Sequence, residues 1–202
     1  MTFKSLVLRN INDPQSEWCR IMYECADALY YIHSKEYLHN DLKDDNVIIN
    51  ENSNSLHPVI IDFGKCSKIA GGKLYHLSPR DQEKYRKYHE HIAPEVVRGT
   101  HPQSTASDIY AFGLLLSLLC KNKRYEPLRE LAFACINGSP ENRPSTQHLV
   151  AELLNCSHQS GIASYKKISF YRPSMGFQRN RPSLKSPSGV FSAHTQYKSM
   201  LT

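Results

Sequence analysis

The chain has 202 residues, 40% of them hydrophobic, and a formal net charge of +6, a composition that fits one globular domain with its own core. No apolar run approaches the ~20 residues that span a bilayer, and residues 1–10 lack the apolar centre of a signal peptide, so we expect a cytoplasmic protein without a membrane span. The six cysteines are scattered without a Cys-x-x-Cys pair, which argues against a disulfide framework and predicts reduced, buried thiols.

Residues 1–15 are expected to form a lead-in to the folded domain, which we place at residues 16–155. Pro14 and Ser16 indicate the start of its first helix. From residue 16 to residue 33, apolar side chains recur at spacings of three and four, the pattern of an amphipathic helix with one buried face. The apolar positions are Trp18, Ile21, Met22, Cys25, Leu29 and Ile32. This helix is expected to deliver the next segment to the core.

The polar segment after this helix carries the most specific chemical signal in the chain. It consists of His39-Asn40-Asp41-Leu42-Lys43-Asp44-Asp45-Asn46, and Ile60-Ile61-Asp62-Phe63-Gly64 follows it. Phosphoryl transfer needs little covalent chemistry from a protein, which has to orient a hydroxyl, hold Mg²⁺ against the phosphates and neutralise developing charge. Asp41 can accept a hydrogen bond from the attacking hydroxyl, and Lys43 can place a cation beside the transferring group.

Two further residues, Asn46 and Asp62, offer hard oxygen ligands of the kind that Mg²⁺ prefers. Short strands are predicted at residues 47–49 and 59–61, on either side of a polar turn, and their pairing brings these two ligands close together. Gly64 is expected to let the backbone turn sharply and aim the Asp62 carboxylate inward.

Three shorter motifs follow in order along the chain. They are Ala93-Pro94-Glu95, Ser107-Asp108-Ile109-Tyr110-Ala111-Phe112-Gly113 and Arg143-Pro144-Ser145. The second lies in an almost continuously apolar stretch, residues 106–119, which predicts a buried central helix, and outer helices are predicted at residues 125–136 and 146–154. Each short motif alone is a weak signal, but five motifs in this order form a specific pattern.

Together these motifs resemble the C-terminal, catalytic lobe of a protein kinase, with an Asn at position 40 where the family has an Arg. The resemblance covers roughly residues 16 to 155. It implies a mainly α fold, with short hairpin strands around the catalytic and magnesium loops. It also implies ATP and Mg²⁺ as cofactors, and transfer of the γ-phosphoryl group to a protein hydroxyl.

The resemblance assigns a role to each residue of the expected active site. Asp41 positions the hydroxyl and accepts its proton, and Lys43 stabilises the transferring charge. Asn46 and Asp62 hold magnesium. Ile48 lies beneath the adenine ring, although packing in the core is an equally open alternative for this side chain.

Other matching residues are expected to have structural roles. They are His39, Phe63, Gly64, Glu95, Asp108 and Arg143. The resemblance predicts that Glu95 and Arg143 form a buried bidentate ion pair, and that Asp108 accepts backbone N–H groups from the catalytic loop near His39.

Several departures from the family pattern bear on regulation and substrate. Asn40 replaces the Arg that meets an activation-loop phosphate, so phosphorylation-dependent switching is not expected, although Ser67, Ser78, Tyr85 and Tyr88 remain candidate phosphosites. Lys43 is typical of Ser/Thr kinases, whereas Tyr88 stands where those enzymes usually carry Thr. Ser/Thr acceptors are therefore favoured over Tyr without excluding it. The connection at residues 120–128 is too short for the extra helix that commonly docks protein substrates.

The glycine-rich loop, strand lysine and helix glutamate of a kinase N-terminal lobe cannot be placed in this sequence. Residues 1–15 contain no glycine, and Gly71-Gly72 lies downstream of Asp62. Lys4 has no strand around it. We therefore expect a C-terminal lobe without its N-terminal β-lobe, either as a fragment or as a short relative. The competing interpretation is a pseudokinase-like interaction or scaffold module without catalysis.

Residues 156–202 are expected to be a disordered, basic, Ser/Pro-rich tail, because residues 157–202 carry seven Lys or Arg and no acid. A phosphorylated or partner-binding segment is the functional alternative. Because these seven residues carry the excess positive charge and leave the rest of the chain near neutral, nucleic acid is not an expected partner. His89 and His91 lack a second ligand cluster, so no other metal site is predicted. The sequence does not indicate an oligomeric state.

Overall fold

The structure, a computed structural model, describes residues 1–8, 15–52, 55–122 and 126–159. Its helices are α1 (Phe3–Leu8), α2 (Gln15–Ser34), α3 (Pro79–Tyr88), α4 (Pro94–Arg98), α5 (Thr105–Asn122), α6 (Glu126–Cys135) and α7 (Thr146–Gln159). Its strands are β1 (Tyr37–Leu38), β2 (Val47–Asn52), β3 (Ser55–Ile60) and β4 (Ser67–Lys68). Short 3₁₀ turns are η1 (Asp44–Asn46), η2 (Phe63–Lys65), η3 (Ile69–Gly71) and η4 (Pro140–Asn142). The predicted mainly α fold with a few short antiparallel strands is confirmed.

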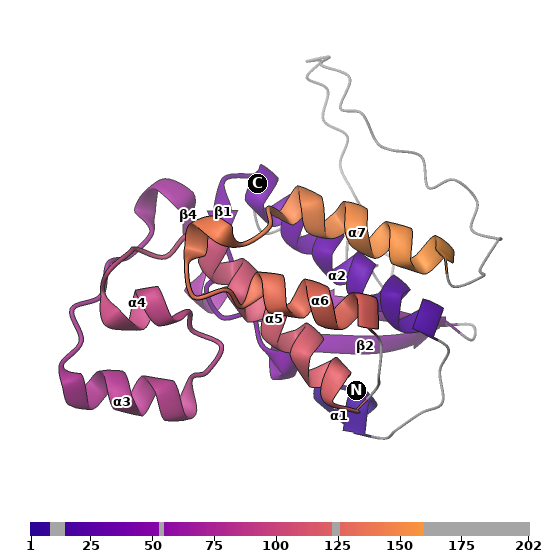
Figure 1. The fold of residues 1–202 in the computed structure, drawn as a ribbon, viewed down its shortest axis with the longest axis horizontal. Coiled ribbons are helices and arrows are strands. Elements are labelled where there is room, and N and C mark those ends of the chain that lie inside the picture. The colour runs from indigo at the N-terminus through magenta and orange to yellow at the C-terminus, as the bar shows by residue number, and fades with distance from the viewer. Residues whose placement is uncertain (9–14, 53–54, 123–125, 160–202) are drawn as a thin grey trace, which may run out of the picture.

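The core is a group of packed helices in which α2 lies beside α7 and α5 lies beside α6 (Figure 1). The six apolar positions predicted for the face of α2 are all at most 2% exposed, which confirms the helical period. Phe112 of α5 is also fully buried, in the same hydrophobic core as these side chains of α2. None of the helices in the part of the chain that the structure describes is long and apolar enough to cross a membrane.

Two small antiparallel hairpins lie next to the helices and position the loops. Strand β2 pairs with β3 from Val47↔Ile60 to Asn52↔Ser55, so both strands extend further than the sequence predicted. The pairing continues past the strand ends, because the Ile61 N–H donates to the Asn46 carbonyl at 2.9 Å. Strand β1 pairs with β4. The start of β2 therefore lies beside the end of β3, the arrangement on which the prediction of a shared magnesium site depends.

The first residues are more than a lead-in. Helix α1 buries Phe3, Leu6 and Val7, and the Phe3 ring makes an edge-on contact with Trp18 at a centroid distance of 6.2 Å. The Ile49 N–H also donates to the carbonyl of residue 1 at 2.7 Å. A helix of six residues is too short for apolar periodicity to reveal, so only its contacts show that it belongs to the core.

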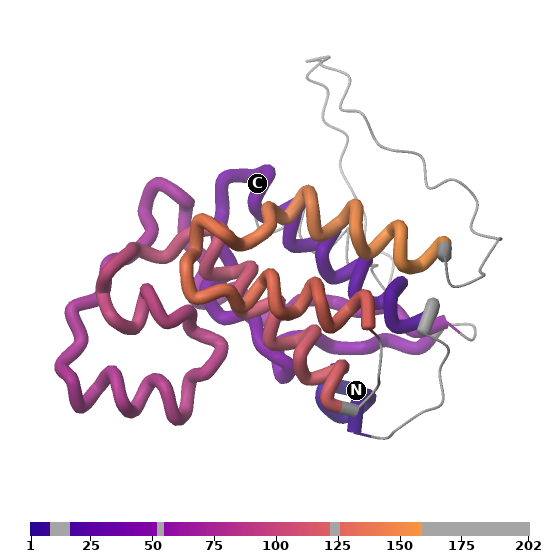
Figure 2. Tube along the Cα trace, in the orientation of Figure 1, coloured from indigo at the N-terminus to yellow at the C-terminus, as the bar shows by residue number. Residues whose placement is uncertain are grey.

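Helices α3 and α4 form a second region that the sequence did not predict, and Figure 2 shows their chain path lying away from the α2 and α7 pair. Helix α3 begins with Ser78 as its N-cap, whose Oγ accepts the Asp81 N–H at 3.2 Å, and with Pro79 in its first turn. None of its residues is buried. Without a buried face it has no apolar stripe, which is why periodicity missed it.

Helix α7 continues to Gln159, so the first residues of the expected tail are helical rather than disordered. The predicted disorder, phosphorylation or partner binding of residues 160–202 lies outside the described residues.

Candidate active site

Asp108 anchors the catalytic loop, the segment at residues 39–46. Its carboxylate accepts the backbone N–H groups of His39 and Asn40 at 2.8 and 2.9 Å. It also lies 3.0 Å from the ring nitrogen Nε2 of His33 in α2. Asp108 is buried near the start of α5. The predicted contact is confirmed, and it fixes the loop to the helical core.

The His39 ring joins this loop to the segment that follows β3. Its Nε2 lies 3.1 Å from the Ile61 carbonyl, and the Asp41 N–H donates to its Nδ1 at 3.3 Å. Burial lowers the pKa of His39 below 6.5, so the ring is neutral at pH 7 and Nε2 carries the proton. The Phe63 ring packs against it edge-on, with centroids 5.1 Å apart. His39 therefore links the loop that carries Asp41 to the loop that carries Asp62 and fixes their relative positions.

The Asp41 carboxylate is buried and accepts four hydrogen bonds from described residues. Its Oδ1 accepts from Lys65 Nζ at 2.7 Å and from His91 Nε2 at 2.9 Å. Its Oδ2 accepts from Asn46 Nδ2 at 3.2 Å and from Lys43 Nζ at 3.3 Å. Burial raises the pKa of Asp41, but hydrogen bonds from the two lysines and His91 outweigh burial and lower the pKa from 3.8 to about 2. The carboxylate is charged at neutral pH.

This lowered pKa predicts a specific loss of stability in acid. Because the folded-state pKa lies below the unfolded value, the contribution of Asp41 is complete above about pH 5 and is lost as the pH falls towards 2. The shift corresponds to about 2 kcal/mol of unfolding free energy. Urea unfolding at pH 6 and pH 2 should therefore show a loss that is about 2 kcal/mol smaller in Asp41→Asn than in wild type. An identical pH dependence in both proteins would contradict this assignment.

Asn46 and Asp62 together fit a magnesium ion by the chemistry of their donors. The Asn46 Nδ2 group donates to the Asp41 backbone oxygen at 2.8 Å as well as to the Asp41 carboxylate, which leaves the Asn46 side-chain oxygen available as a ligand. Asp62 is exposed at the end of β3, beside the Ile61 that pairs with Asn46. One carboxylate and one amide oxygen, completed by water and phosphate oxygens, are typical of protein-bound Mg²⁺.

The role predicted for Gly64 is wrong in its mechanism. The sharp turn is made by Asp62 itself, whose φ of 63° is left-handed, whereas Gly64 is not in a positive-φ conformation. Gly64 matters for another reason, because its N–H donates to Asp62 Oδ1 at 3.3 Å and an added Cβ would lie 3.2 Å from that same oxygen. The small residue leaves room for the carboxylate rather than permitting the turn.

Ile48 lies on the face of β2 opposite to the buried Val47 and Ile49. It is half-buried and does not belong to the core cluster, so its side chain is not explained by core packing. Thr2 forms a β-bridge with it. The contact of Ile48 with adenine stays a prediction.

Two residues at the site were missed by sequence reasoning. Lys65 follows Gly64 directly, and His91 precedes Ala93 by two positions, yet both contact Asp41. Burial lowers the pKa of His91, so a neutral ring donates its Nε2–H to Asp41. No group of three metal-ligating side chains occurs among the described residues. The one sequence signal for Lys65 was its position directly after Asp62-Phe63-Gly64.

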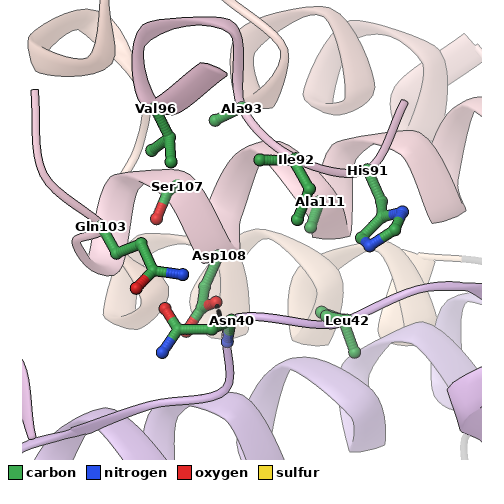
Figure 3. Close-up of a pocket in the computed structure, with 10 residues that line it drawn as sticks. All are labelled: Asn40, Leu42, His91, Ile92, Ala93, Val96, Gln103, Ser107, Asp108 and Ala111. Carbon is green, nitrogen blue, oxygen red and sulfur yellow. Dashed lines mark hydrogen bonds between the residues drawn. The ribbon is translucent and has the colours of Figure 1, made fainter. Parts of the chain in front are cut away.

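Asn40 connects the catalytic loop to the segment after β3 through its side chain. Its Nδ2 donates to the Lys65 carbonyl at 3.0 Å and to Ser67 Oγ at 2.9 Å. Figure 3 shows Asn40 in a pocket between the loop and α5, facing Gln103. The buried Asn40 Oδ1 has no hydrogen-bond partner among the described residues. The left-handed backbone of Asn40, with φ 64°, is tolerated because Asn is one of the few side chains that adopt it readily.

Glu95 and Arg143 form the predicted buried ion pair. Arg143 Nη1 and Nη2 donate to Glu95 Oε1 and Oε2 at 2.7 and 2.8 Å, a bidentate arrangement. Arg143 also donates to the backbone oxygens of Ala106 and Asn137, each at 2.9 Å. The pair therefore ties the start of α4 to the start of α5 and to the turn after α6.

Comparison with known protein families identifies the family to which this fold and site belong. A family model described as Protein kinase domain matches residues 2–130, more than half of the chain. The chain belongs to the protein kinase family. The match includes α1, which agrees with the burial of that helix in the core of this kinase.

Individual relatives of this kinase carry kinase names. Maternal embryonic leucine zipper kinase of Xenopus laevis is 35% identical over 111 residues, 52% of this chain and 15% of that protein. A probable serine/threonine-protein kinase of Dictyostelium discoideum is 28% identical over 165 residues, 69% of this chain and 37% of the relative. Serine/threonine-protein kinase PkaA of Streptomyces coelicolor is 26% identical over 170 residues, 69% of this chain and 29% of the relative. The chain spans well under half the length of each.

Proposed function

We propose that this kinase transfers the γ-phosphoryl group of ATP to Ser or Thr hydroxyls of proteins, with Mg²⁺. The observation that carries the proposal is the Asp41 carboxylate, which is buried, charged and held between Lys43 and Asn46 at the end of the β2–β3 hairpin. A fixed acceptor for the substrate hydroxyl next to a cation and oxygen ligands is the minimum that phosphoryl transfer requires.

The low pKa of Asp41 defines its part in this chemistry. A carboxylate with a pKa of about 2 is a weak base, so it contributes mainly by orienting the hydroxyl through a hydrogen bond, and it takes the proton late. Lys43, which lies 3.3 Å from the Asp41 carboxylate, places a positive charge beside the equatorial oxygens of the transferring group. His91 and Asn46 keep the carboxylate in position from two sides.

Asn46 and Asp62 are the residues that would hold magnesium. When bound, the ion neutralises charge on the β- and γ-phosphate oxygens. Ile48, on the open face of β2, is proposed to pack against the adenine ring. We further propose that the folded kinase unit includes α1 and extends to the end of α7.

The metal ligands predict a binding experiment that needs no turnover. With Mn²⁺ in place of Mg²⁺ and ATP present, paramagnetic broadening should affect the NMR signals of the Asn46 side-chain amide and the Gly64 amide. Asp62→Asn should raise the Mn²⁺ concentration required at least about tenfold, because it removes the one charged ligand. Asp45→Asn, a change in an exposed acid of the same loop, should leave it unchanged. Equal titrations of wild type and Asp62→Asn would refute the ligand assignment.

Two observations support Ser/Thr rather than Tyr acceptors. Lys43 stands two residues after Asp41, the arrangement typical of Ser/Thr kinases, and the Dictyostelium and Streptomyces relatives carry serine/threonine-protein kinase names. Tyr88, at the position where such enzymes usually carry Thr, is 66% exposed at the end of α3. His91 rather than residue 88 contacts Asp41 from this segment.

A non-catalytic interaction module is the second candidate, and one observation favours it. Every acceptor position of the Asp41 carboxylate is used by a neighbouring side chain, so none is open to a substrate hydroxyl in this arrangement. Such a module would show neither Mn²⁺ broadening at Asn46 nor ATP turnover.

A further inference from the structure

The four hydrogen bonds to Asp41 differ in how easily each can be given up. A carboxylate has about four acceptor positions, so a substrate hydroxyl has to replace one of the present donors. Asn46 is buried, and the His91 side chain is 12% exposed. The Lys43 side chain is 31% exposed and that of Lys65 is 58% exposed. Lys65 is therefore the donor with the most freedom to leave.

The backbone of Lys65 is fixed while its side chain is not. Asn40 Nδ2 donates to the Lys65 carbonyl, and the turn η2 is closed by the Cys66 N–H donating to the Phe63 carbonyl at 3.0 Å. The long side chain can therefore swing away from Asp41 without moving the loop that carries Asp62. The ammonium group then reaches solvent directly, since more than half of the side chain is already exposed.

We propose that Lys65 is a gate for the substrate hydroxyl, an ammonium group that occupies the acceptor position on Asp41 Oδ1 until substrate binding displaces it. The proposal rests on the proposed function, because it assumes that Asp41 receives the hydroxyl. Lys43 and Lys65 together bring two positive charges to one carboxylate. Because of this excess of positive charge, an anionic nucleotide phosphate can attract the Lys65 ammonium group away from Asp41. Bound nucleotide and acceptor together therefore favour the open state, in which Lys65 has left Asp41.

The closed contact can be measured without any turnover. Competitive labelling of the whole chain with acetic anhydride, followed by peptide mass spectrometry, compares the reaction rates of individual lysines. Lys65 should react about tenfold more slowly than Lys68, an exposed lysine three residues further along the chain. In Asp41→Asn the two lysines should react equally fast. Equal reaction rates of Lys65 and Lys68 in the wild-type chain would overturn the proposal that Lys65 is a gate.

The gate also predicts a particular kinetic change in the complete protein. If the closed state is favoured about tenfold, Lys65→Met should lower the KM for the protein acceptor by about tenfold and leave kcat within about twofold. Lys65→Arg keeps the cation and should retain the wild-type KM, and Lys68→Met should change neither constant. An unchanged KM, or a loss of kcat, in Lys65→Met would overturn the proposal. Absence of turnover in every variant would instead refute the proposed function, while the labelling still reports the contact.

Discussion

Asp41→Asn should lower kcat for phosphoryl transfer in the complete protein by at least about 100-fold. Asn presents an NH₂ group and one oxygen in place of two charged oxygens, so it orients the hydroxyl poorly and cannot take its proton. It also leaves Lys43 and Lys65 beside a neutral amide. The measurement is the steady-state rate of ADP formation with Mg-ATP and a protein acceptor.

The matched control is Asp45→Asn, which makes the same chemical change at an exposed position of the same loop. Its rate should stay within about twofold of wild type, since surface substitutions away from the site change little. A urea unfolding curve for each variant separates lost chemistry from lost folding. Turnover by a folded Asp41→Asn protein at the wild-type rate would refute the mechanism.

Glu95→Ala should destabilise the domain by about 3 to 5 kcal/mol. The Arg143 side chain is 0% exposed, so removal of its carboxylate partner leaves a charge that water cannot reach. The measurement is the free energy of unfolding in urea at pH 7. Arg129→Ala provides the control, because its partner Glu126 lies on the surface and such pairs contribute under about 1 kcal/mol.

A double variant distinguishes an unpaired charge from lost packing. Glu95→Leu combined with Arg143→Met removes both charges and retains most of the volume, so it should be less destabilised than Glu95→Ala alone. A double variant that is destabilised by the sum of both single changes would show that the pair acts through independent contacts. A loss below about 1 kcal/mol in Glu95→Ala would contradict the burial of the pair.

The parts of the fold that the sequence predicted are those in which one physical rule dominates. Helix α2 shows its apolar stripe because one face is buried along its length, and the pair of Glu95 and Arg143 follows from a motif whose geometry the family fixes. The ends of α5 and α6 were predicted to within a few residues for the same reason. The pairing of β2 with β3 followed from apolar residues on both sides of a polar turn.

The remainder depended on tertiary contacts that no local pattern encodes. Helix α3 buries nothing, and α1 is too short to show a period. The contacts of Lys65 and His91 with Asp41 join residues 24 and 50 positions away. Gly64 was expected to permit the sharp turn after β3, but Asp62 itself adopts the left-handed backbone, because Asp can adopt this conformation as well as glycine.

The central claim is that this kinase uses Asp41 and a magnesium ion held by Asn46 and Asp62 to phosphorylate Ser or Thr. It is tested most directly by incubating the complete protein with Mg²⁺ and γ-labelled ATP and identifying the labelled amino acids of a mixed protein acceptor. The account predicts label on Ser and Thr with wild type, and none with Asp41→Asn or Asp62→Asn. Label on Tyr alone, or equal label with wild type and Asp41→Asn, would contradict it.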